Sequence, residues 1–209
     1  MNHVNNPVWA SLIFVISVVM ETLFPIESNY PEGFSYYPQF ISIEEEKFLI
    51  NLISGIELHN FQFHGYEAKR KVASFGYDYS FEKKALSKGK AIPGEFNFLI
   101  EKVCQQAGIK TTDIAELLVT EYPTGSVINW HRDAPPFDLI AGISLYADCI
   151  LKLRPHEKEK QGRNSVVSIP LIKRSLYLLQ GKVRSDWQHS TAPVKNKRYS
   201  ITLRTLRTH

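Results

Sequence analysis

Two histidines and one aspartate provide side chains that could bind a metal ion. His131 and Asp133 stand two positions apart, and His189 follows much later, directly after Trp187 and Gln188. Two imidazoles and a carboxylate form the ligand set of a mononuclear non-haem Fe(II) site with open coordination positions. Residues two apart at a strand end project in the same direction, so one ion could contact both His131 and Asp133. Zinc is the alternative metal, and ordinary half-buried histidines are the alternative without a metal.

A run near the C-terminus has polar residues at every second position. In a strand, one face would carry Arg198, Ser200, Thr202 and Arg204, and the other Tyr199, Ile201 and Leu203. Two guanidiniums in a row could grip a dicarboxylate through paired hydrogen bonds. A zinc hydrolase has no use for such a clamp. An Fe(II) oxygenase does, because its iron must accept a chelating 2-oxo acid and dioxygen. The pattern therefore predicts Fe(II), with 2-oxoglutarate and dioxygen as co-substrates.

Composition is that of one ordinary folded domain. The chain has 209 residues, of which 44% are hydrophobic and 22% charged, and its net charge is +4. This charge permits an anionic partner without requiring one. Basic residues gather around positions 69–71, 83–90 and 195–207, which indicates either a solvated surface or a polyanionic substrate. Two cysteines, Cys104 and Cys149, are expected to be reduced and buried in a cytoplasmic protein.

The N-terminal region, residues 1–25, is predicted to be an apolar extension separate from the domain at 26–209. Val8 to Met20 is almost continuously apolar, yet shorter than the roughly 20 residues that a membrane-spanning helix needs. It also lacks the flanking pattern of a secretory signal. We favour translation from Met20, with the preceding stretch as upstream sequence. A hydrophobic appendage and a functional membrane anchor are the alternatives, and membrane association is not expected.

Two helices followed by many short strands are expected. Ser42 and Glu45 form a capping-box pattern that opens a helix ending at Gly55. A second helix is expected from Pro93 to Gly108, with one apolar stripe. Short strands rich in β-branched and aromatic residues are expected at 117–122, 126–131, 139–146, 149–154, 166–170, 175–180 and 198–206. The pattern predicts an α+β, mainly β fold, a double-stranded β-helix or jelly roll buttressed by the N-terminal helices.

These motifs resemble the AlkB-like 2-oxoglutarate- and Fe(II)-dependent dioxygenases over roughly residues 31–207. The metal motif matches, and residues 198–204 match the family's Arg-x-Asn-x-Thr-x-Arg apart from Ser200. The resemblance implies that His131, Asp133 and His189 bind iron. It also implies that Arg198 meets the distal carboxylate of 2-oxoglutarate and Arg204 the end nearer the metal. Tyr122 stands where the family has a tyrosine that contacts the co-substrate, and Thr120 replaces a second asparagine.

A tyrosine-rich segment resembles the family's nucleotide-recognition lid. Its Gly-Tyr-x-Tyr pattern includes Tyr77 and Tyr79, and Lys69, Arg70 and Lys71 precede it. Tyrosines can stack on a base and cations can pair with phosphates. The alternative is a tyrosine-rich edge strand. Some AlkB proteins read the base with an acidic residue two positions after the metal-binding aspartate. Pro135 stands there, so base selectivity does not transfer.

The resemblance implies oxidative demethylation of N-alkylated bases, such as 1-methyladenine or 3-methylcytosine, in DNA or RNA, as in alkylation-damage repair. 2-Oxoglutarate would be converted to succinate while an N-methyl carbon is hydroxylated and leaves as formaldehyde. A protein or small-molecule hydroxylase is the alternative enzyme, and a catalytically silent binding module is the alternative without activity. We expect methylated DNA or RNA as partner, no obligate protein partner and a monomer.

Overall fold

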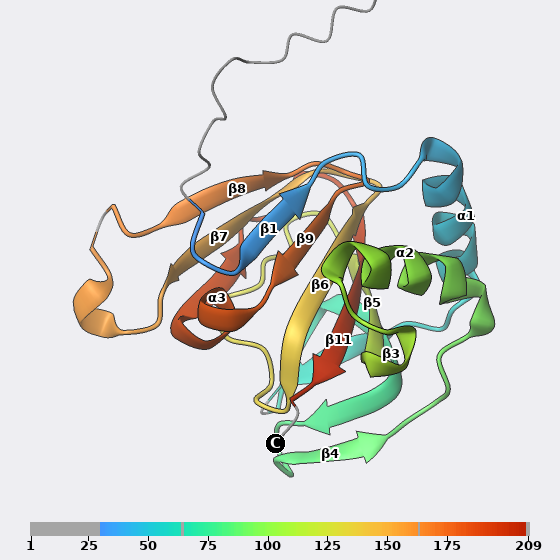
Figure 1. The fold of residues 1–209 in the computed structure, drawn as a ribbon, viewed down its shortest axis with the longest axis horizontal. Helices are drawn as coiled ribbons and strands as arrows, with labels where there is room; N and C mark the ends of the chain where they lie inside the picture. The colour runs from blue at the N-terminus through green and yellow to red at the C-terminus, as the bar shows by residue number, and fades with distance from the viewer. Residues whose placement is uncertain (1–29, 64, 163, 208–209) are drawn as a thin grey trace, which may run out of the picture.

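The computed structural model describes residues 30–207, apart from positions 64 and 163 (Figure 1). The apolar stretch Val8 to Met20 lies outside these residues, so its interpretation stays a prediction. Within the described part of the chain, no helix is both long and apolar enough to cross a membrane. Cys104 and Cys149 are free and buried, as expected.

Both predicted helices are present. Helix α1 (Ile43–Ser54) opens with the expected capping box, in which the Ser42 hydroxyl and the Glu45 carboxylate each accept from the other's backbone N–H. Helix α2 (Asn97–Ala107) ends at Gly108, which adopts a left-handed conformation with φ +69°. Lys102 on α2 pairs with Glu45 on α1 at 2.9 Å. The short α3 (Gly181–Asp186) was not expected.

Within the described residues, eight strands form a large antiparallel sheet and three form a smaller one. In spatial order the large sheet consists of β1 (Phe34–Tyr37), β9 (Leu176–Leu179), β6 (Phe137–Leu145), β11 (Arg198–Leu206), β5 (Ile114–Tyr122), β3 (Tyr66–Ser80) and β2 (His59–Phe63), with β4 (Ala85–Lys88) paired to β3. The small sheet consists of β10 (Trp187–Thr191), β7 (Cys149–Pro155) and β8 (Val167–Leu171). The fold is mainly β, as predicted.

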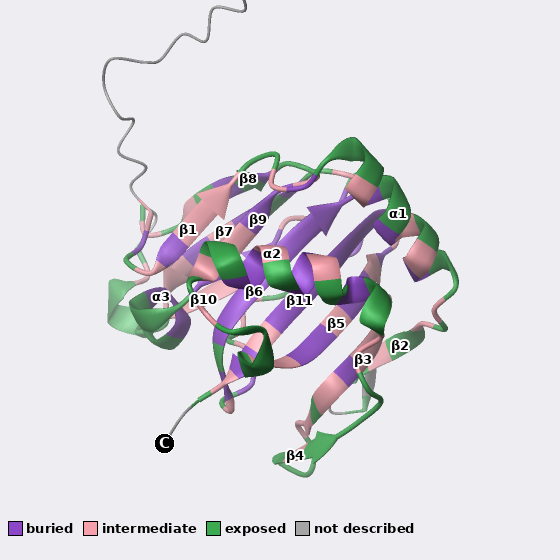
Figure 2. Ribbon diagram, turned by 45° about the vertical axis from the view of Figure 1, so that its right-hand side comes forward, coloured by how far each residue is buried: buried purple, intermediate pink, exposed green. Residues whose placement is uncertain are grey.

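Alternation along the strands creates two apolar cores. Tyr199, Ile201 and Leu203 of β11 lie in a helix-side core with residues of α1 and α2, and Figure 2 shows α2 lying across the buried strands β6, β11 and β5. The opposite face of the large sheet, here called the inner face, packs with the small sheet around an inner core that includes Tyr122, Ile140 and Leu153. The residues that could do chemistry on β11 belong to the inner face.

One predicted strand is wrong, and five strands were missed. Residues 126–131 form an extended connection rather than a strand, because its hydrogen bonds are scattered and the N–H of Ile128 is taken by the Thr191 side chain. The strands that were not predicted are β1, β2, β3, β4 and β10. Four of them precede the second helix.

Strand β3 changes partner at Gly76. Lys71 to Gly76 pairs with β5, whereas Tyr77 to Ser80 pairs with β4 and forms a hairpin that Figure 1 shows at the lower edge of the molecule. Gly76 has φ +86°, and a Cβ placed there would lie 2.2 Å from the carbonyl oxygen of Ala115. Glycine is therefore required at this position both by conformation and by space.

Replacing Gly76 by alanine should destabilise the fold far more than replacing Gly65, another glycine at positive φ (+76°) but with open space around its Cβ position. In both variants the free energy of unfolding should fall by about 1–2 kcal/mol, because alanine is strained in the left-handed conformation. Only Gly76→Ala adds a backbone clash, worth about 1–3 kcal/mol more. Chemical denaturation would measure both, and equal losses of stability would contradict this account of Gly76.

Candidate metal and co-substrate site

A two-residue backbone pairing brings His131 and His189 together. The N–H of each donates to the carbonyl of the other, at 3.0 and 2.9 Å, in an isolated antiparallel bridge between the connection after β5 and strand β10. Their rings lie with centroids 4.2 Å apart. Residues far apart in the sequence are thus fixed as neighbours by main-chain hydrogen bonds, which do not depend on side-chain rotamers.

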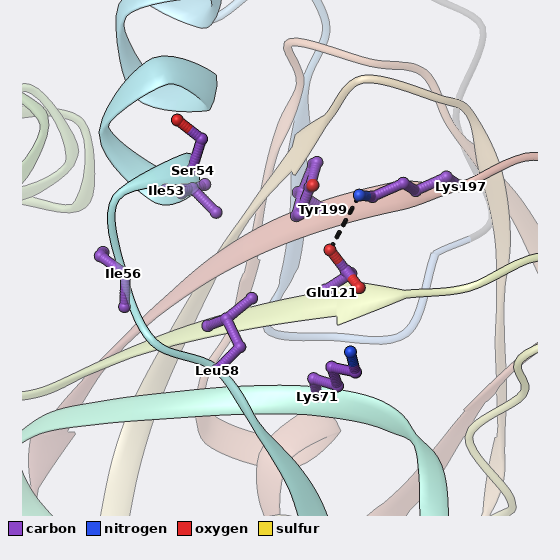
Figure 3. Close-up of a pocket in the computed structure, with 8 residues that line it drawn as sticks. All are labelled: Ile53, Ser54, Ile56, Leu58, Lys71, Glu121, Lys197 and Tyr199. Atoms are coloured by element: carbon purple, nitrogen blue, oxygen red, sulfur yellow. Dashed lines mark ion pairs between the residues drawn. The ribbon is translucent and has the colours of Figure 1, made fainter.

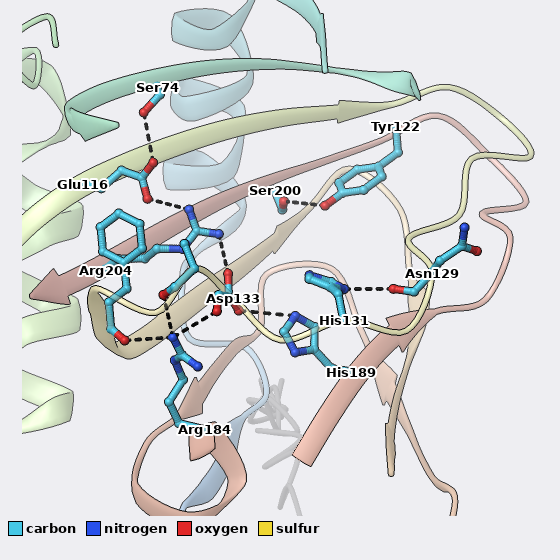
Figure 4. Close-up of polar contacts among 12 residues, drawn as sticks. Ser74, Glu116, Tyr122, Asn129, His131, Asp133, Arg184, His189, Ser200 and Arg204 are labelled. Carbon is cyan, nitrogen blue, oxygen red and sulfur yellow. Dashed lines mark hydrogen bonds and ion pairs between the residues drawn. The ribbon is translucent and has the colours of Figure 1, made fainter. Parts of the chain in front are cut away.

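Asp133 completes a group in which one ligand atom from each residue lies within 4.8 Å of the others. Its Oδ2 is 3.4 Å from His189 Nε2. His131 Nδ1 lies 2.8 Å from the carbonyl oxygen of Asn129 (Figure 4). Donation of the Nδ1–H to that oxygen leaves Nε2 free with its lone pair, which is the usual arrangement of a metal-binding histidine.

Arg204 links the Asp133 carboxylate to a second buried carboxylate. Its Nη2 donates to Asp133 Oδ1 at 2.6 Å, and its Nη1 pairs with Glu116, which also accepts from the Ser74 hydroxyl at 3.0 Å. The side chains of Arg204, Asp133 and Glu116 are only 14%, 6% and 4% exposed. Buried charges of this kind are tolerated only when they are paired, so the three residues must be considered as one unit.

The same neighbours set the protonation states. Burial alone would raise the pKa of Asp133, but Arg204 and the two histidines hold that pKa well below its usual range. Burial and the nearby His131 lower the pKa of His189 to about 3. At neutral pH, therefore, Asp133 is ionised and His189 is neutral. These are the forms that bind metal ions.

Arg184 of α3 holds the backbone that carries Asp133. Its Nη2 faces the carbonyl oxygens of Asp133, Ala134 and Phe137 at 3.3, 2.8 and 2.8 Å. Arg132 adds a second tie by donating to the Ser185 carbonyl at 2.9 Å. The loop between His131 and β6 is thus fastened to the segment that leads into β10 and His189.

Arg198 lies on the inner face of β11, at the opposite end of that strand from Arg204. It is 3% exposed, its guanidinium sits 4.9 Å from the centroid of the Tyr122 ring, and its Nε donates to the Ser144 hydroxyl at 3.2 Å. Tyr122 and Ser200 share a hydrogen bond of 3.3 Å (Figure 4). Among the described residues no carboxylate pairs with Arg198. A buried guanidinium without an anion is costly unless a ligand provides one.

These residues fit a divalent metal ion and a dicarboxylate. Asp133 Oδ2 is buried without a hydrogen-bond partner in the described structure, and it faces the two imidazoles. Two imidazole nitrogens and one carboxylate oxygen are a donor set that Fe(II) accepts. Arg198 could donate to the far carboxylate of a ligand that reaches the metal, since Arg198 and Arg204, the partner of Asp133, both lie on the inner face of β11.

The residues predicted to bind the co-substrate differ in whether their hydrogen-bonding groups are already used within the protein. Thr202 and Ser200 are buried on the inner face between the two arginines, and Thr120 is register partner to Ser200. Both Nη atoms of Arg204 already donate to protein carboxylates, and only its Nε lacks a partner among the described residues. Its contact with 2-oxoglutarate stays a prediction and would have to use that Nε or displace a carboxylate.

The basic cluster at residues 69–71 is divided between two faces. Arg70 lies 3.9 Å above the Phe61 ring and close enough to Tyr122 to interact with it electrostatically. Strand alternation sends Lys69 and Lys71 to the opposite face. There Lys71, Glu121, Lys197 and Tyr199 line a surface pocket of about 330 Å³ at the end of α1 (Figure 3).

Tyr77 and Tyr79 lie in the β3–β4 hairpin, half-buried and two positions apart. Tyr79 packs against the inner core and meets Phe81 edge-to-face at 5.1 Å. Lys83, Lys84, Lys88 and Lys90 of the same hairpin are exposed. The segment is thus an edge hairpin, and its location beside the inner face is also compatible with the lid interpretation.

Sequence reasoning missed Glu116, Arg184 and Asn129. A signal existed for Glu116, because it stands in an apolar strand two positions from Leu118 and shares a face with Thr120 and Tyr122. Nothing in the sequence marks Arg184 or the Asn129 carbonyl. Their roles arise from backbone groups that only the folded chain brings within reach.

Curated relatives are found among tRNA-modifying proteins. The chain is 27% identical to the tRNA (carboxymethyluridine(34)-5-O)-methyltransferase alkbh8 of Xenopus tropicalis and 28% identical to ALKBH8 of Mus musculus. The first match covers 90% of this chain but 29% of the relative, and the second covers 79% and 25%. The chain therefore spans less than a third of the length of these relatives.

Solved structures share the fold at low sequence identity. OsALKBH1 superposes with a TM-score of 0.67 at 13% identity, covering 84% of this chain and 98% of that one. A prolyl hydroxylase in complex with a hypoxia inducible factor peptide fragment, from Trichoplax adhaerens, gives 0.60 at 19% identity, covering 83% of each chain.

The sequence model of the 2OG-Fe(II) oxygenase superfamily matches residues 33–207, nearly the whole described domain. That match, the relatives and the His-Asp-His cluster identify an enzyme that uses Fe(II), 2-oxoglutarate and dioxygen. The chain is an AlkB-like member of the 2OG-Fe(II) oxygenase superfamily.

Proposed function

We propose that this protein oxidatively demethylates N-alkylated bases in RNA or DNA. One observation carries the proposal. Asp133 Oδ2 is buried beside two histidines with no hydrogen-bond partner in the described part of the chain, and the nearby Arg198 is buried there with no carboxylate to pair with. A metal ion would give the carboxylate oxygen a partner, and a dicarboxylate would give Arg198 one. The coarser part, an Fe(II)- and 2-oxoglutarate-dependent dioxygenase, follows from the family.

In this proposal His131, Asp133 and His189 hold Fe(II), which with 2-oxoglutarate and dioxygen supplies the oxidising power for hydroxylation of a carbon. The protein's own contribution is positioning. Arg204 fixes the Asp133 carboxylate through Oδ1 and leaves Oδ2 for the metal. Asn129 fixes the tautomer of His131 through its carbonyl.

Arg198 is proposed to bind the distal carboxylate of 2-oxoglutarate, with Tyr122 and Ser200 beside it and Thr202 along the path to the metal. The guanidinium presents a planar fork of donors that matches a carboxylate. Its Nε already donates to Ser144, which holds the fork in place for the ligand. Arg204 is proposed to border the end nearer the metal.

A nucleic-acid substrate is supported by the surface around this site. Arg70 sits half-buried near Tyr122 on the inner face, and among the described residues no ion pair neutralises it. The adjoining hairpin adds Tyr77, Tyr79 and four exposed lysines. Aromatic side chains can stack on an unpaired base while cations contact phosphates. The matched relatives are named as tRNA-modifying proteins, which favours RNA.

A protein hydroxylase is the second candidate, because prolyl hydroxylases are among the structural neighbours. Those matches are below 20% identity, so they speak for the shared fold alone. An assay for formaldehyde and succinate with N-methylated RNA and DNA oligonucleotides separates the two. Formaldehyde release that depends on the methylated base supports demethylation, and 2-oxoglutarate turnover with no nucleic-acid product would favour the alternative.

His131→Ala and His189→Ala should each lower turnover by on the order of 100-fold or more, since even outer partners of metal ligands are worth about 10–100-fold. Fe(II) affinity, measured anaerobically by calorimetry, should fall in parallel. His59→Ala is the matched control, because its side chain is 68% exposed on β2. Normal metal binding in either site variant would remove that histidine from the ligand set.

Arg198→Lys should raise the KM for 2-oxoglutarate by about 10-fold or more, because lysine keeps the charge but loses the bidentate fork. Arg174→Lys serves as control, since Arg174 pairs with Glu46 on the helix side of the sheet. Fe(II) affinity should be unchanged in both variants. An unaltered KM in Arg198→Lys would show that the clamp lies elsewhere.

Arg70→Gln should weaken binding of a methylated single-stranded oligonucleotide, whereas Lys69→Gln on the opposite face should have little effect. If Arg70 contacts a phosphate, its loss should also make the log–log salt dependence shallower by about 0.7. Replacing both Tyr77 and Tyr79 by alanine should lower affinity by about 1–3 kcal/mol per stacked base without changing that slope. Unchanged binding in both Arg70→Gln and the double tyrosine variant would contradict the lid interpretation.

A further inference from the structure

Arg154 of β7 contacts the two residues that directly precede the metal-binding histidines. Its guanidinium lies 4.3 Å from the centroid of the Trp130 ring, and its Nε donates to Gln188 Oε1 at 2.9 Å. Trp130 is followed by His131, and Gln188 is followed by His189. One side chain therefore joins both chain segments that carry an imidazole.

These contacts lie on the outer face of the small sheet, away from the inner core. Arg154 and Gln188 are register partners, and so are Leu153 and His189. Leu153 is buried in the inner core, so strand alternation places Arg154 and Gln188 on the opposite face. Strand β7 is paired on both sides, with β10 and with β8, and its Leu151 and Leu153 are buried. Arg154 thus projects from a strand that is itself firmly held.

The main-chain contacts between the two histidine segments leave their relative orientation open. His131 and His189 meet in an isolated bridge, and the other hydrogen bonds between the 126–131 connection and the β10 segment are irregularly spaced. Two hydrogen bonds fix the distance between two backbones, but pairs of extended segments vary widely in twist. Twist about the bridge would turn the two imidazoles relative to each other, since both project from the bridged residues. A contact that joins the same segments on the opposite face limits that twist.

We propose that Arg154 is a positioning residue for the metal site. By holding Trp130 and Gln188 it sets the orientation of His131 and His189 toward a bound ion. This rests on the ligand set of the proposed function and adds a residue that touches neither metal nor substrate. A guanidinium suits the task, because its plane can stack on an indole while its edge donates a hydrogen bond. Within the described part of the chain, no carboxylate forms an ion pair with Arg154.

The matched pair Arg154→Met and Lys152→Met tests the proposal. Both changes replace a half-buried cation on the outer face of β7 by an apolar side chain, but Lys152 is register partner to Ser190 rather than Gln188. The probe is Co(II), which accepts the same nitrogen and oxygen ligands as Fe(II) and has an absorption spectrum that reports their geometry. Co(II) affinity, measured by calorimetry, should fall by about 10-fold in Arg154→Met, the lower end of what residues behind metal ligands contribute. Lys152→Met should bind like the wild type.

Substitutions of Trp130 separate positioning from a loss of stability. Trp130→Phe keeps an aromatic face for Arg154 and should keep the Co(II) spectrum of the wild type. Trp130→Leu removes that face and should change the spectrum as Arg154→Met does. The double variant of Trp130→Leu and Arg154→Met should bind no more weakly than the weaker single variant, because both changes break the same contact. This series also decides the matter if Arg154→Met does not fold, because Trp130→Leu must then differ from Trp130→Phe.

A lower Tm in Arg154→Met with unaltered Co(II) affinity and spectrum would overturn the proposal, since the contact would then only stabilise the fold. An equal loss of affinity in Lys152→Met would overturn it as well, and so would identical spectra of Trp130→Phe and Trp130→Leu. Failure of the wild type to bind Co(II), or normal binding by His131→Ala, would instead overturn the ligand set of the proposed function.

Discussion

The Asp133 carboxylate sits where solvent scarcely reaches it, and most of the site is arranged around that constraint. Arg204 neutralises it through one oxygen and is itself shared with Glu116, so three charges are buried as one unit. Arg184 binds the backbone of the same loop, and the His131–His189 bridge joins that loop to β10. Removing Arg204 would leave both buried carboxylates without the cation that pairs with them. The outcome is a carboxylate oxygen aimed at the imidazoles of His131 and His189, in place for a divalent ion before it binds.

The double-sheet architecture allows polar residues to line one face of β11. One face of β11 packs in the helix-side core with α1 and α2, where large aliphatic side chains are fully buried. The other face is then free to carry Arg198, Ser200, Thr202 and Arg204 between the two sheets. Apolar burial stabilises by about 25 cal/mol per Å², and it offsets the desolvation of these polar groups. Core packing and the placement of the polar site residues therefore use opposite faces of one strand and do not compete for the same positions.

Glu116 also connects the site to the hairpin proposed to meet the substrate. It is the register partner of Gly76, the residue at which β3 changes from β5 to β4, and it accepts a hydrogen bond from Ser74 two positions earlier. The base of the hairpin and the Arg204–Asp133 pair therefore share one carboxylate. Any movement of the hairpin on substrate binding would shift Glu116 and, through Arg204, the metal-binding carboxylate of Asp133.

Local sequence pattern was sufficient for the elements whose signals are local. The Ser42–Glu45 capping box and Gly108 specified two helix boundaries, alternation from Arg198 to Arg204 specified a two-faced strand, and the His-x-Asp motif indicated the metal chemistry. Tertiary structure alone decided that Arg204 faces two carboxylates and that the Ser200 hydroxyl meets that of Tyr122. Each depends on register between strands far apart in the sequence, which sets the neighbours of every side chain and leaves no mark within either strand.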